Sequence, residues 1–597
     1  MLRTFESYFS DASIVKELCR LRVKLAQKRN DTLFLHRISS QSPPHSDKKI
    51  PKLHPGLLEL FPPRRRWHSS RPRKRGRQSS IDINLRTLVS LVEKRRQLRP
   101  QESWASQLED RAKRIQERVL STRSFVFHPP RITAMPKDPH KNVYRALTQY
   151  SDDDKIIESL TARYLKSFID PLLASSCLAF RCGTKGSPPP TIHTALRTIS
   201  DFRSSAAGKK LYVAECDIQG FFDSVAHATA LKTVRSLAKK ATKLDKTLRV
   251  STRALQILKA YLDSYSYPRN VLGHALSKLQ KRDPSASFKW PKKELASLYK
   301  PMTLPKGIGV PQGGALSCLI ANAVLNTADA SLDKLKRSAG LNFLYLRYCD
   351  DMILIARSKR TCCEAFSTYR SAIKGLKLPI HRPKEVAPYQ TTAGKKQFWQ
   401  GKSRLPYSWE KPVCKRGIPW IQFVGYQIRY DGLVRVRLSS LRKQFKKLVT
   451  CADQLLSILN PGRKSPHEIT AFSPGIRKTR RQILHRFRLK LISIAVGRKQ
   501  LHHPPDDIMP TCWASGFSGM KEYSIIGAHL KALDRRRDRQ ISRVKKRCLM
   551  MPKPIEKKDP EARKAYSYYG FPFSYWAQFL AHPPSTATLT EEDPGSH

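Results

Sequence analysis

The sequence predicts a mixed α+β fold, because short apolar strands alternate along the chain with stretches of helical periodicity. An apolar strand at 211–216 ends on Asp217, and the largely apolar run 343–356 contains an acidic pair at its centre, which predicts a hairpin. A second hairpin is predicted across 131–147. Helical spacing of leucines covers 81–120, 154–173 and 441–459. With 597 residues, the chain has room for several domains.

The charge of the chain is its strongest compositional signal. It carries 112 Lys and Arg against 47 Asp and Glu, a formal net charge of +65. A compact fold with that self-repulsion needs polyanionic counter-charge, so the expected partner is nucleic acid. We expect no membrane partner, because we find no run of about 18 apolar residues. We also expect no secretory signal, because the first 30 residues carry Glu6, Asp11 and Glu17.

The 12 cysteines are scattered along the chain. No Cys-x-x-Cys pair occurs, and nothing near Cys177 and Cys182 completes a zinc set. Free thiols in a reducing compartment are therefore expected, which argues for a cytoplasmic location and against an appended zinc-dependent nuclease.

The acidic pair lies in the sequence Tyr348-Cys349-Asp350-Asp351, at the expected tip of the hairpin. Taken alone, such a pair is more often a solvated turn. Unpaired charges on a buried hairpin are costly, however, whereas carboxylates that hold divalent cations are compensated by them. Asp217 ends another core strand, and carboxylates from separate strands can hold two divalent ions about 3.5 to 4 Å apart. We therefore interpret Asp217, Asp350 and Asp351 as a metal site.

Two further segments belong to the same argument. The turn Pro311-Gln312-Gly313-Gly314 precedes an apolar helical stretch, and glycines there let the backbone approach a ligand closely. By itself this turn is equally consistent with a plain loop before a helix. In the hairpin at 131–147, Lys137 and Arg145 are expected to face the same space, where they would suit a triphosphate.

Together these segments resemble the reverse transcriptases of bacterial group II introns, retrons and related defence systems. The resemblance covers roughly 131–435, with a looser continuation toward 500. Its motifs occur in the family's order: Asp217 to Asp223, Pro311 to Gly314, and Tyr348 to Asp351. Weaker matches are Leu178 to Arg181, Leu378 to Glu385, and Phe423 to Tyr426. The resemblance implies a bacterial protein with a right-hand polymerase fold: fingers, a palm with an antiparallel sheet, and a helical thumb.

The resemblance also implies roles for single residues. Asp217 and Asp350 would be the principal ligands of two Mg²⁺ ions, for which Mn²⁺ can substitute, with Asp351 beside them and the Ile218 carbonyl completing the shell. Phe222 would be the steric gate that excludes a ribose 2′-hydroxyl. The remaining implied roles are nucleotide-pocket lining by Gln312 and Gly313, support of the hairpin by Arg347, and triphosphate binding by Lys137 and Arg145.

The expected domain organisation follows from these assignments. It comprises a basic, largely flexible arm (1–80) with an amphipathic helix expected around 14–27, a helical extension (81–130), fingers and palm (131–435), a helical thumb (436–500), and a basic, aromatic C-terminal extension (501–597). Basic residues of the thumb would track the backbone of the template and primer: Arg477, Lys478, Arg480 and Arg481. Two inserts depart from the family pattern, at 232–302 and 386–420. The tryptophans of the second insert would stack on bases or, as we favour, pack in a subdomain.

The predicted function is RNA-directed DNA synthesis from deoxynucleotides on an associated RNA template, in a phage-defence or host-serving role. Two alternatives remain open from the sequence: a group II intron maturase or other RNA-binding splicing cofactor, and an RNA-dependent RNA polymerase. Phe222 argues against the latter. The template could be a dedicated non-coding RNA or an intron, and the sequence leaves the primer and the oligomeric state open.

Overall fold

The computed structural model divides the chain into two compact units. The first unit comprises 1–21, 99–424 and 429–431, and the second comprises 22–98, 425–428 and 432–597. Within them the structure describes residues 4–39, 55–67, 80–98, 103–138, 142–183, 189–247, 249–299, 303–411, 417–459, 480–496 and 524–549. Helices and antiparallel strands are both present, so the predicted α+β class is confirmed.

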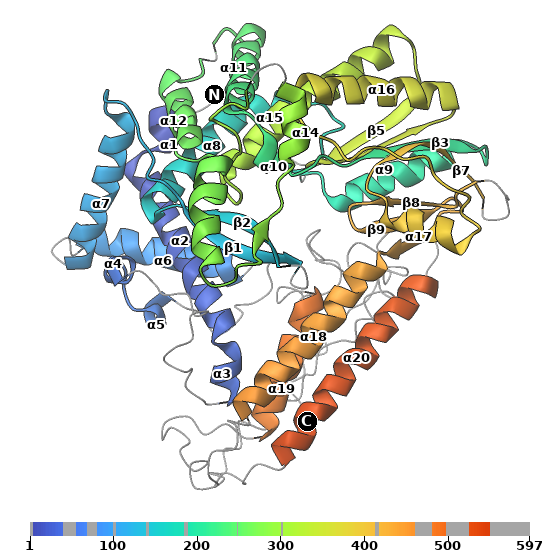
Figure 1. The fold of residues 1–597 in the computed structure, drawn as a ribbon. Helices are drawn as coiled ribbons and strands as arrows, with labels where there is room; N and C mark the ends of the chain where they lie inside the picture. The colour runs from blue at the N-terminus through green and yellow to red at the C-terminus, as the bar shows by residue number, and fades with distance from the viewer. Residues whose placement is uncertain are drawn as a thin grey trace, which may run out of the picture. The chain divides into compact units, whose positions relative to one another are not determined.

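The first unit contains a four-stranded antiparallel sheet in the order β5-β6-β3-β7. Its strands are β3 (Leu211–Cys216), β5 (Phe343–Tyr348), β6 (Asp351–Ala356) and β7 (Arg404–Trp409). The predicted central strand and hairpin are both confirmed. Cys216 pairs with Met352 in the register of β3 and β6, so Asp217 leaves its strand beside the hairpin turn. Helix α16 (Lys359–Gly375) packs against this sheet (Figure 1).

Helix α15 (Ala315–Ser338) is the central helix of the first unit, with α8 (Asp152–Ile169), α11 (His227–Leu244) and α16 packed against it. Among the described residues it is the one helix long and apolar enough to cross a membrane by length and composition, although polar residues interrupt its apolar sequence. In the structure 67% of its most apolar window is buried, as in the core helix of a globular domain.

A second sheet of the first unit has the order β1-β2-β4. Strands β1 (Arg131–Asp138) and β2 (Val143–Gln149) form the predicted hairpin, and β4 (Ser287–Phe288) pairs in parallel with β2. Strand β4 comes from the predicted insert 232–302, so this insert completes a sheet. Its other described elements, besides the end of α11, are α12 (Thr252–Asp263), the π-helix η3 (Tyr267–Ala275), α13 (Leu276–Gln280) and α14 (Lys292–Tyr299).

The N-terminal residues differ from the expectation of a largely flexible arm. Helices α1 (Phe5–Tyr8) and α2 (Asp11–Thr32) form there, and in the first unit the Phe5 ring lies 5.0 Å from that of Tyr164 on α8. Phe5, Phe9 and Leu18 are buried. Leu57, Phe61 and Trp67, from the basic, Pro-rich sequence that follows, are buried as well. Other elements of this unit are α7 (Ser103–Leu120), η2 (Asp170–Leu172), α9 (Ile192–Ser204), α10 (Phe221–Ser224), α17 (Thr392–Gln400) and β8 (Trp420–Phe423).

The second unit is mainly helical. Helix α18 (Leu438–Leu459) packs with α3 (Phe34–Ser39), α19 (Arg480–Val496) and α20 (Ser524–Leu549). Segments predicted as N-terminal arm, thumb and C-terminal extension therefore share one unit, because their apolar faces cover one another. Its remaining elements are α4 (Pro55–Glu59), α5 (Arg64–Trp67), α6 (Ser80–Leu98), and the paired strands β9 (Tyr426–Arg429) and β10 (Val434–Val436).

Candidate active site

Asp217 is fixed at the end of β3 by residues that follow it by more than 160 positions. Its amide donates to Ser403 Oγ at 2.9 Å, and its carbonyl accepts from the His381 amide at 2.9 Å. Its carboxylate Oδ2 lies 3.0 Å from Lys402 Nζ and 3.6 Å from His381 Nε2. Lys402 and Ser403 belong to the predicted insert 386–420, and pairing of β7 with β3 brings them here.

Asp350 lies in the two-residue turn between β5 and β6, since Tyr348 pairs with Asp351. Cys349 has a φ of 60°, a left-handed conformation that non-glycine residues rarely adopt. The turn is held from within the core, because Arg347 Nη1 donates to the Cys349 carbonyl at 3.0 Å. Burial alone would lower the pKa of Arg347, but the Asp329 carboxylate, 2.6 Å from Nη2, raises it well above its usual value.

Cys216 pairs with Met352, so Asp217 and Asp350 lie at neighbouring strand ends, and their carboxylates are electrostatically coupled. Burial raises the pKa of Asp350, and the charge of Asp217 raises it further. Such coupling is expected where two acids share a site, and it favours a bound cation. The Lys402 ammonium already binds the Asp217 carboxylate, so this position accommodates a cationic group. Asp217 and Asp350 therefore suit a divalent ion.

The structure does not bring Asp351 into that pair. Asp351 is exposed at the start of β6, and no three His, Cys, Asp or Glu side chains within the described ranges gather closely enough to hold a metal ion. Ile218 is 2% exposed and forms an isolated bridge with Ile380. Metal ligation by Asp351 and by the Ile218 carbonyl thus stays a prediction.

Gln312 is held on both its side chain and its backbone. Its Nε2 donates to Asp223 Oδ1 at 2.6 Å, and its carbonyl accepts from the Thr148 hydroxyl at 2.8 Å. Burial raises the pKa of Asp223 to about 7, against the opposing effects of Gln312, Lys137 and Arg145. No role for Asp223 was predicted from the sequence. The available signal was an acid inside an otherwise apolar block, directly after Phe222.

Phe222 is hydrogen-bonded to the segment that leads into the turn containing Gln312, Gly313 and Gly314. The Phe222 carbonyl accepts from the Val310 amide at 2.6 Å, and its half-buried ring lies 5.2 Å from that of Phe221. Gly313 is exposed with a φ of 112°, a conformation that favours glycine. Gly314 precedes α15 and faces Glu158, whose carboxylate accepts from the Leu316 amide at 3.1 Å.

Four cations gather around these acids. Burial lowers the pKa of Lys137, and the charges of Arg145, Lys402 and Lys289 lower it further, so these three cations lie within electrostatic reach of Lys137. The expected proximity of Lys137 and Arg145 is thus present. The other two come from the inserts, Lys289 directly after β4 and Lys402 two residues before β7. Such a cluster beside carboxylates suits a metal-bound polyphosphate.

Residues 135–398 match a family model described as "Reverse transcriptase (RNA-dependent DNA polymerase)". The chain contains a reverse transcriptase domain. A domain of this family is an RNA-directed DNA polymerase, a nucleotidyltransferase. The matched range includes Asp217, Gln312 and Asp350 and ends before Lys402, so the reverse transcriptase domain contains both members of the carboxylate pair.

Solved structures of two telomerases are among those similar to the chain that carries this reverse transcriptase domain. Telomerase from Candida albicans with a fragment of telomeric RNA has 11% identity and a TM-score of 0.32, covering 75% of this chain and 66% of that chain. Apo telomerase from Candida tropicalis has 14% identity and a TM-score of 0.34, covering 91% and 82%. At these TM-scores the matches support no conclusion about this protein. A search of curated proteins found no match.

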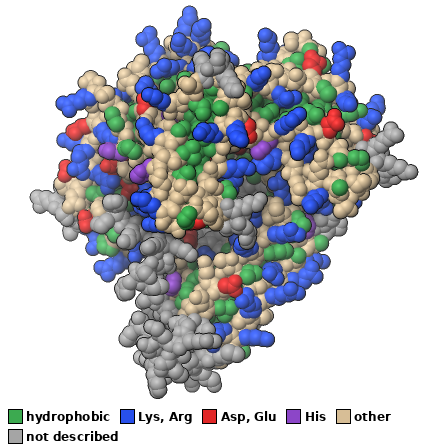
Figure 2. Space-filling model, in the orientation of Figure 1, with side chains coloured by type: hydrophobic (Ala, Val, Ile, Leu, Met, Phe, Trp, Pro, Cys, Tyr) green, Lys and Arg blue, Asp and Glu red, His purple; other side chains and the backbone are tan. Residues whose placement is uncertain are grey.

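Of the other residues singled out from the sequence, the insert tryptophan Trp409 is packed in the protein, and the predicted thumb cations lie outside what the structure describes. Trp409, just after the reverse transcriptase domain, is fully buried and its Nε1 donates to the Pro419 carbonyl at 3.1 Å, as expected of a packed subdomain. Arg477 and Lys478 lie outside the described residues. Arg480 and Arg481 begin α19, but their side chains are also outside what the structure describes. On the face shown in Figure 2, Lys and Arg side chains far outnumber Asp and Glu.

Proposed function

We propose that the protein is an RNA-directed DNA polymerase whose catalytic centre is the Asp217–Asp350 pair. The observation that carries this is the juxtaposition, inside a reverse transcriptase domain, of two coupled carboxylates with the four cations Lys137, Arg145, Lys289 and Lys402. Carboxylates alone would serve a hydrolase equally well. The added cations favour a nucleoside triphosphate as the substrate.

Asp217 and Asp350 would hold Mg²⁺, with Mn²⁺ as a substitute. Bound metal supplies two effects in nucleotidyl transfer: it lowers the pKa of the attacking primer hydroxyl and stabilises the leaving pyrophosphate. The protein's own groups orient the reactants. The cation cluster binds the triphosphate, Gln312 is aimed into the nucleotide pocket by Asp223, and Arg347 fixes the turn that presents Asp350.

Primer extension tests this function. We expect the purified protein to extend a primer on an RNA template with deoxynucleotides in Mg²⁺, to lose this activity in a chelator, and to regain it in Mn²⁺. Failure to extend on RNA, with efficient extension on DNA under the same conditions, would contradict RNA-directed synthesis.

Within this class we propose a bacterial enzyme related to group II intron, retron and defence-associated reverse transcriptases, acting on an associated RNA. The motif order of the sequence supports this proposal, and the two inserts favour a phage-defence or host-serving role over intron mobility. Sequencing of nucleic acid that co-purifies with the protein decides the role. A defined non-coding RNA would support the proposal, whereas an intron would favour a maturase or splicing cofactor.

Phe222→Ala is expected to relax sugar discrimination. Because the Phe222 backbone is fixed by Val310 and its ring by Phe221, removal of the ring opens space in the nucleotide pocket without moving the chain. We expect the preference for deoxynucleotides over ribonucleotides, measured as the ratio of kcat/KM values, to fall by on the order of 10-fold or more. Phe222→Tyr, which keeps the ring, is the matched control. An unchanged ratio in the alanine variant would remove the gate assignment and revive an RNA-dependent RNA polymerase.

Lys402→Ala is expected to strengthen the binding of metal and to weaken the binding of nucleotide. A divalent ion on Asp217 must displace the Lys402 ammonium, whose side chain is 55% exposed and free to move toward the phosphates. Loss of this competitor should tighten Mn²⁺ binding without nucleotide by about two- to fivefold, the worth of an exposed ion pair. Loss of a phosphate-binding cation should raise KM for deoxynucleotides.

Electron paramagnetic resonance of Mn²⁺ and steady-state extension measure the two effects of Lys402→Ala separately. Lys396→Ala is the control, because Lys396 is exposed on α17 in the same insert. Weaker or unchanged Mn²⁺ binding in Lys402→Ala would show that the lysine does not compete with metal.

A further inference from the structure

The second unit contains a groove between α18 and α20. The two helices run in the same direction, because β10, which precedes α18, contacts α20, and Asp453 pairs with Arg543 at 2.9 Å further along. Burial, and then the charge of Arg435 on β10, lower the pKa of His529 near the start of α20. The two helices pack against each other, and Leu448 and Leu455 of α18 and Val544 of α20 are buried. The charged side chains beside this apolar seam are therefore carried on a rigid pair of helices.

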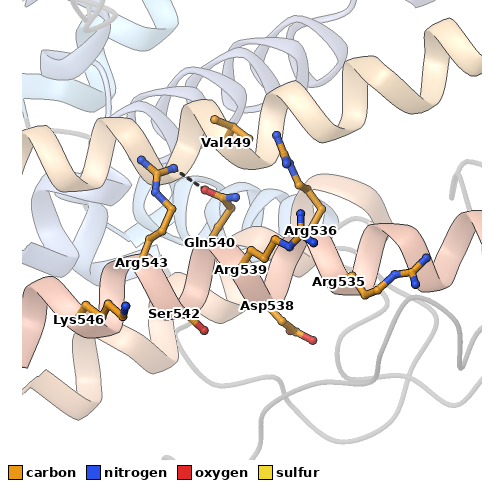
Figure 3. A pocket seen from close by; sticks show the side chains of 9 residues that line it. All are labelled: Val449, Arg535, Arg536, Asp538, Arg539, Gln540, Ser542, Arg543 and Lys546. Atoms are coloured by element: carbon orange, nitrogen blue, oxygen red, sulfur yellow. Dashed lines mark hydrogen bonds between the residues drawn. The ribbon is translucent and has the colours of Figure 1, made fainter.

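The groove has a volume of about 740 Å³ and is strongly basic (Figure 3). Its cations all come from α20: Arg535, Arg536, Arg539, Arg543 and Lys546. Asp538 is the one acid and Val449 the one large apolar residue among the residues that line it. In Figure 3, Arg536 and Arg543 point toward α18, whereas Arg535 extends along α20.

Most of this charge is not neutralised by the protein. Arg543 pairs with Asp453 and donates to Gln540 at 2.7 Å. For the other four cations, no hydrogen bond or ion pair is formed within the described part of the chain. The Nε of Arg536 is buried there without a hydrogen-bond acceptor, which is unusual for a guanidinium nitrogen. The groove therefore lacks acceptor oxygens that a ligand could supply.

We propose that this groove binds the phosphodiester backbone of a nucleic-acid strand. Arg535 and Lys546 are separated by about 16 Å along a helix that rises 1.5 Å per residue. A strand presents one phosphate charge per roughly 3.4 Å of axis, so about five phosphates match the length of the stripe. Guanidinium groups bind phosphate through paired hydrogen bonds. Val449 is the one large apolar side chain that lines the groove, so the groove offers little apolar surface on which the side chains of an acidic peptide could pack.

The site lies outside the reverse transcriptase domain, at 135–398, and its charge and geometry do not depend on the polymerase reaction. The choice of nucleic acid over other polyanions rests on the proposed function. It would be an anchoring site for the strand, with contacts to phosphates that carry no sequence information.

The test compares two double variants of the full chain with equal loss of charge. Arg535→Gln with Arg539→Gln removes two exposed groove cations, and Lys531→Gln with Lys545→Gln removes two exposed cations of α20 that do not line the groove. Binding of a labelled 20-nucleotide RNA is measured by fluorescence anisotropy at several KCl concentrations, without nucleotides. Thermal melting checks that both variants fold.

We expect the groove variant to bind about 10-fold more weakly, with a salt slope smaller by about 1.4, and the control pair to change little. Equal losses in both pairs would overturn the proposal, as would competition by poly-glutamate as effective as that by unlabelled RNA. If the groove variant loses as much affinity for DNA of the same sequence as for RNA, recognition of phosphates is supported. A loss of affinity confined to RNA contradicts it. A protein that binds but never extends would refute the polymerase while leaving the groove intact.

Discussion

Gly314→Ala is expected to be strongly destabilising to the reverse transcriptase domain. A Cβ at this position would lie 2.0 Å from Glu158 Oε1 and 2.3 Å from the Tyr261 hydroxyl. Neither neighbour can yield, because Glu158 is 4% and Tyr261 0% exposed. Glu158 also caps α15 through the Leu316 amide, and the Tyr261 hydroxyl lies 2.9 Å from Ser317 Oγ. The substitution therefore disrupts packing and a buried hydrogen-bond network together.

The expected cost of Gly314→Ala is about 1–3 kcal/mol from overpacking, with a further 1–3 kcal/mol if the Glu158 carboxylate loses its partners. Thermal melting of the purified variant measures it, and polymerase activity should fall with the loss of the Gln312 turn. Gly375→Ala is the matched control. A Cβ there meets nothing within 4 Å at the end of α16, so it should be neutral or stabilising. A melting temperature of Gly314→Ala equal to wild type would contradict the described packing of Glu158 and Tyr261.

Asp217→Asn and Asp350→Asn are each expected to reduce deoxynucleotide incorporation on the order of 10³-fold or more, with little effect on melting. Asparagine preserves the shape of each side chain and removes the charge that would hold a metal ion. Because the two acids serve one centre, the double variant should be hardly worse than either single variant. Asp351→Asn, on the same hairpin but exposed, should cost less. Additive losses would mean that the acids act in separate sites.

The sequence predicted the elements that present these acids, and the reason is physical. Acids that end or interrupt apolar strands are conspicuous, so Asp217 and the Asp350 hairpin could be placed correctly. Lys289 and Lys402 could not be found this way, since single lysines among 112 Lys and Arg carry no signal. Both inserts had been set apart as departures from the family pattern, yet they deliver these lysines to the site.

Long-range packing accounts for what else the sequence did not reveal. A Gly-Gly turn predicts close backbone approach, but nothing local identifies Glu158 as the group approached. The assignment of α3, α18 and α20 to one unit depends on apolar faces that lie more than 400 residues apart in the chain. Composition suggested flexibility for most of the first 80 residues, and the apolar periodicity around 14–27 indicated a helix there, but no local pattern showed that α1 would pack on α8. Pattern alone cannot decide such cases.

The most direct test of the central claim is primer extension on an RNA template by the Asp350→Ala, Asp351→Ala double variant. The carboxylate that Asp217 faces is then gone, while Arg347 and Asp329 still hold the core of the hairpin. We expect a folded protein that binds RNA as the wild type does and incorporates no deoxynucleotide. Full extension by this variant would contradict the assignment of the hairpin as part of a polymerase active site.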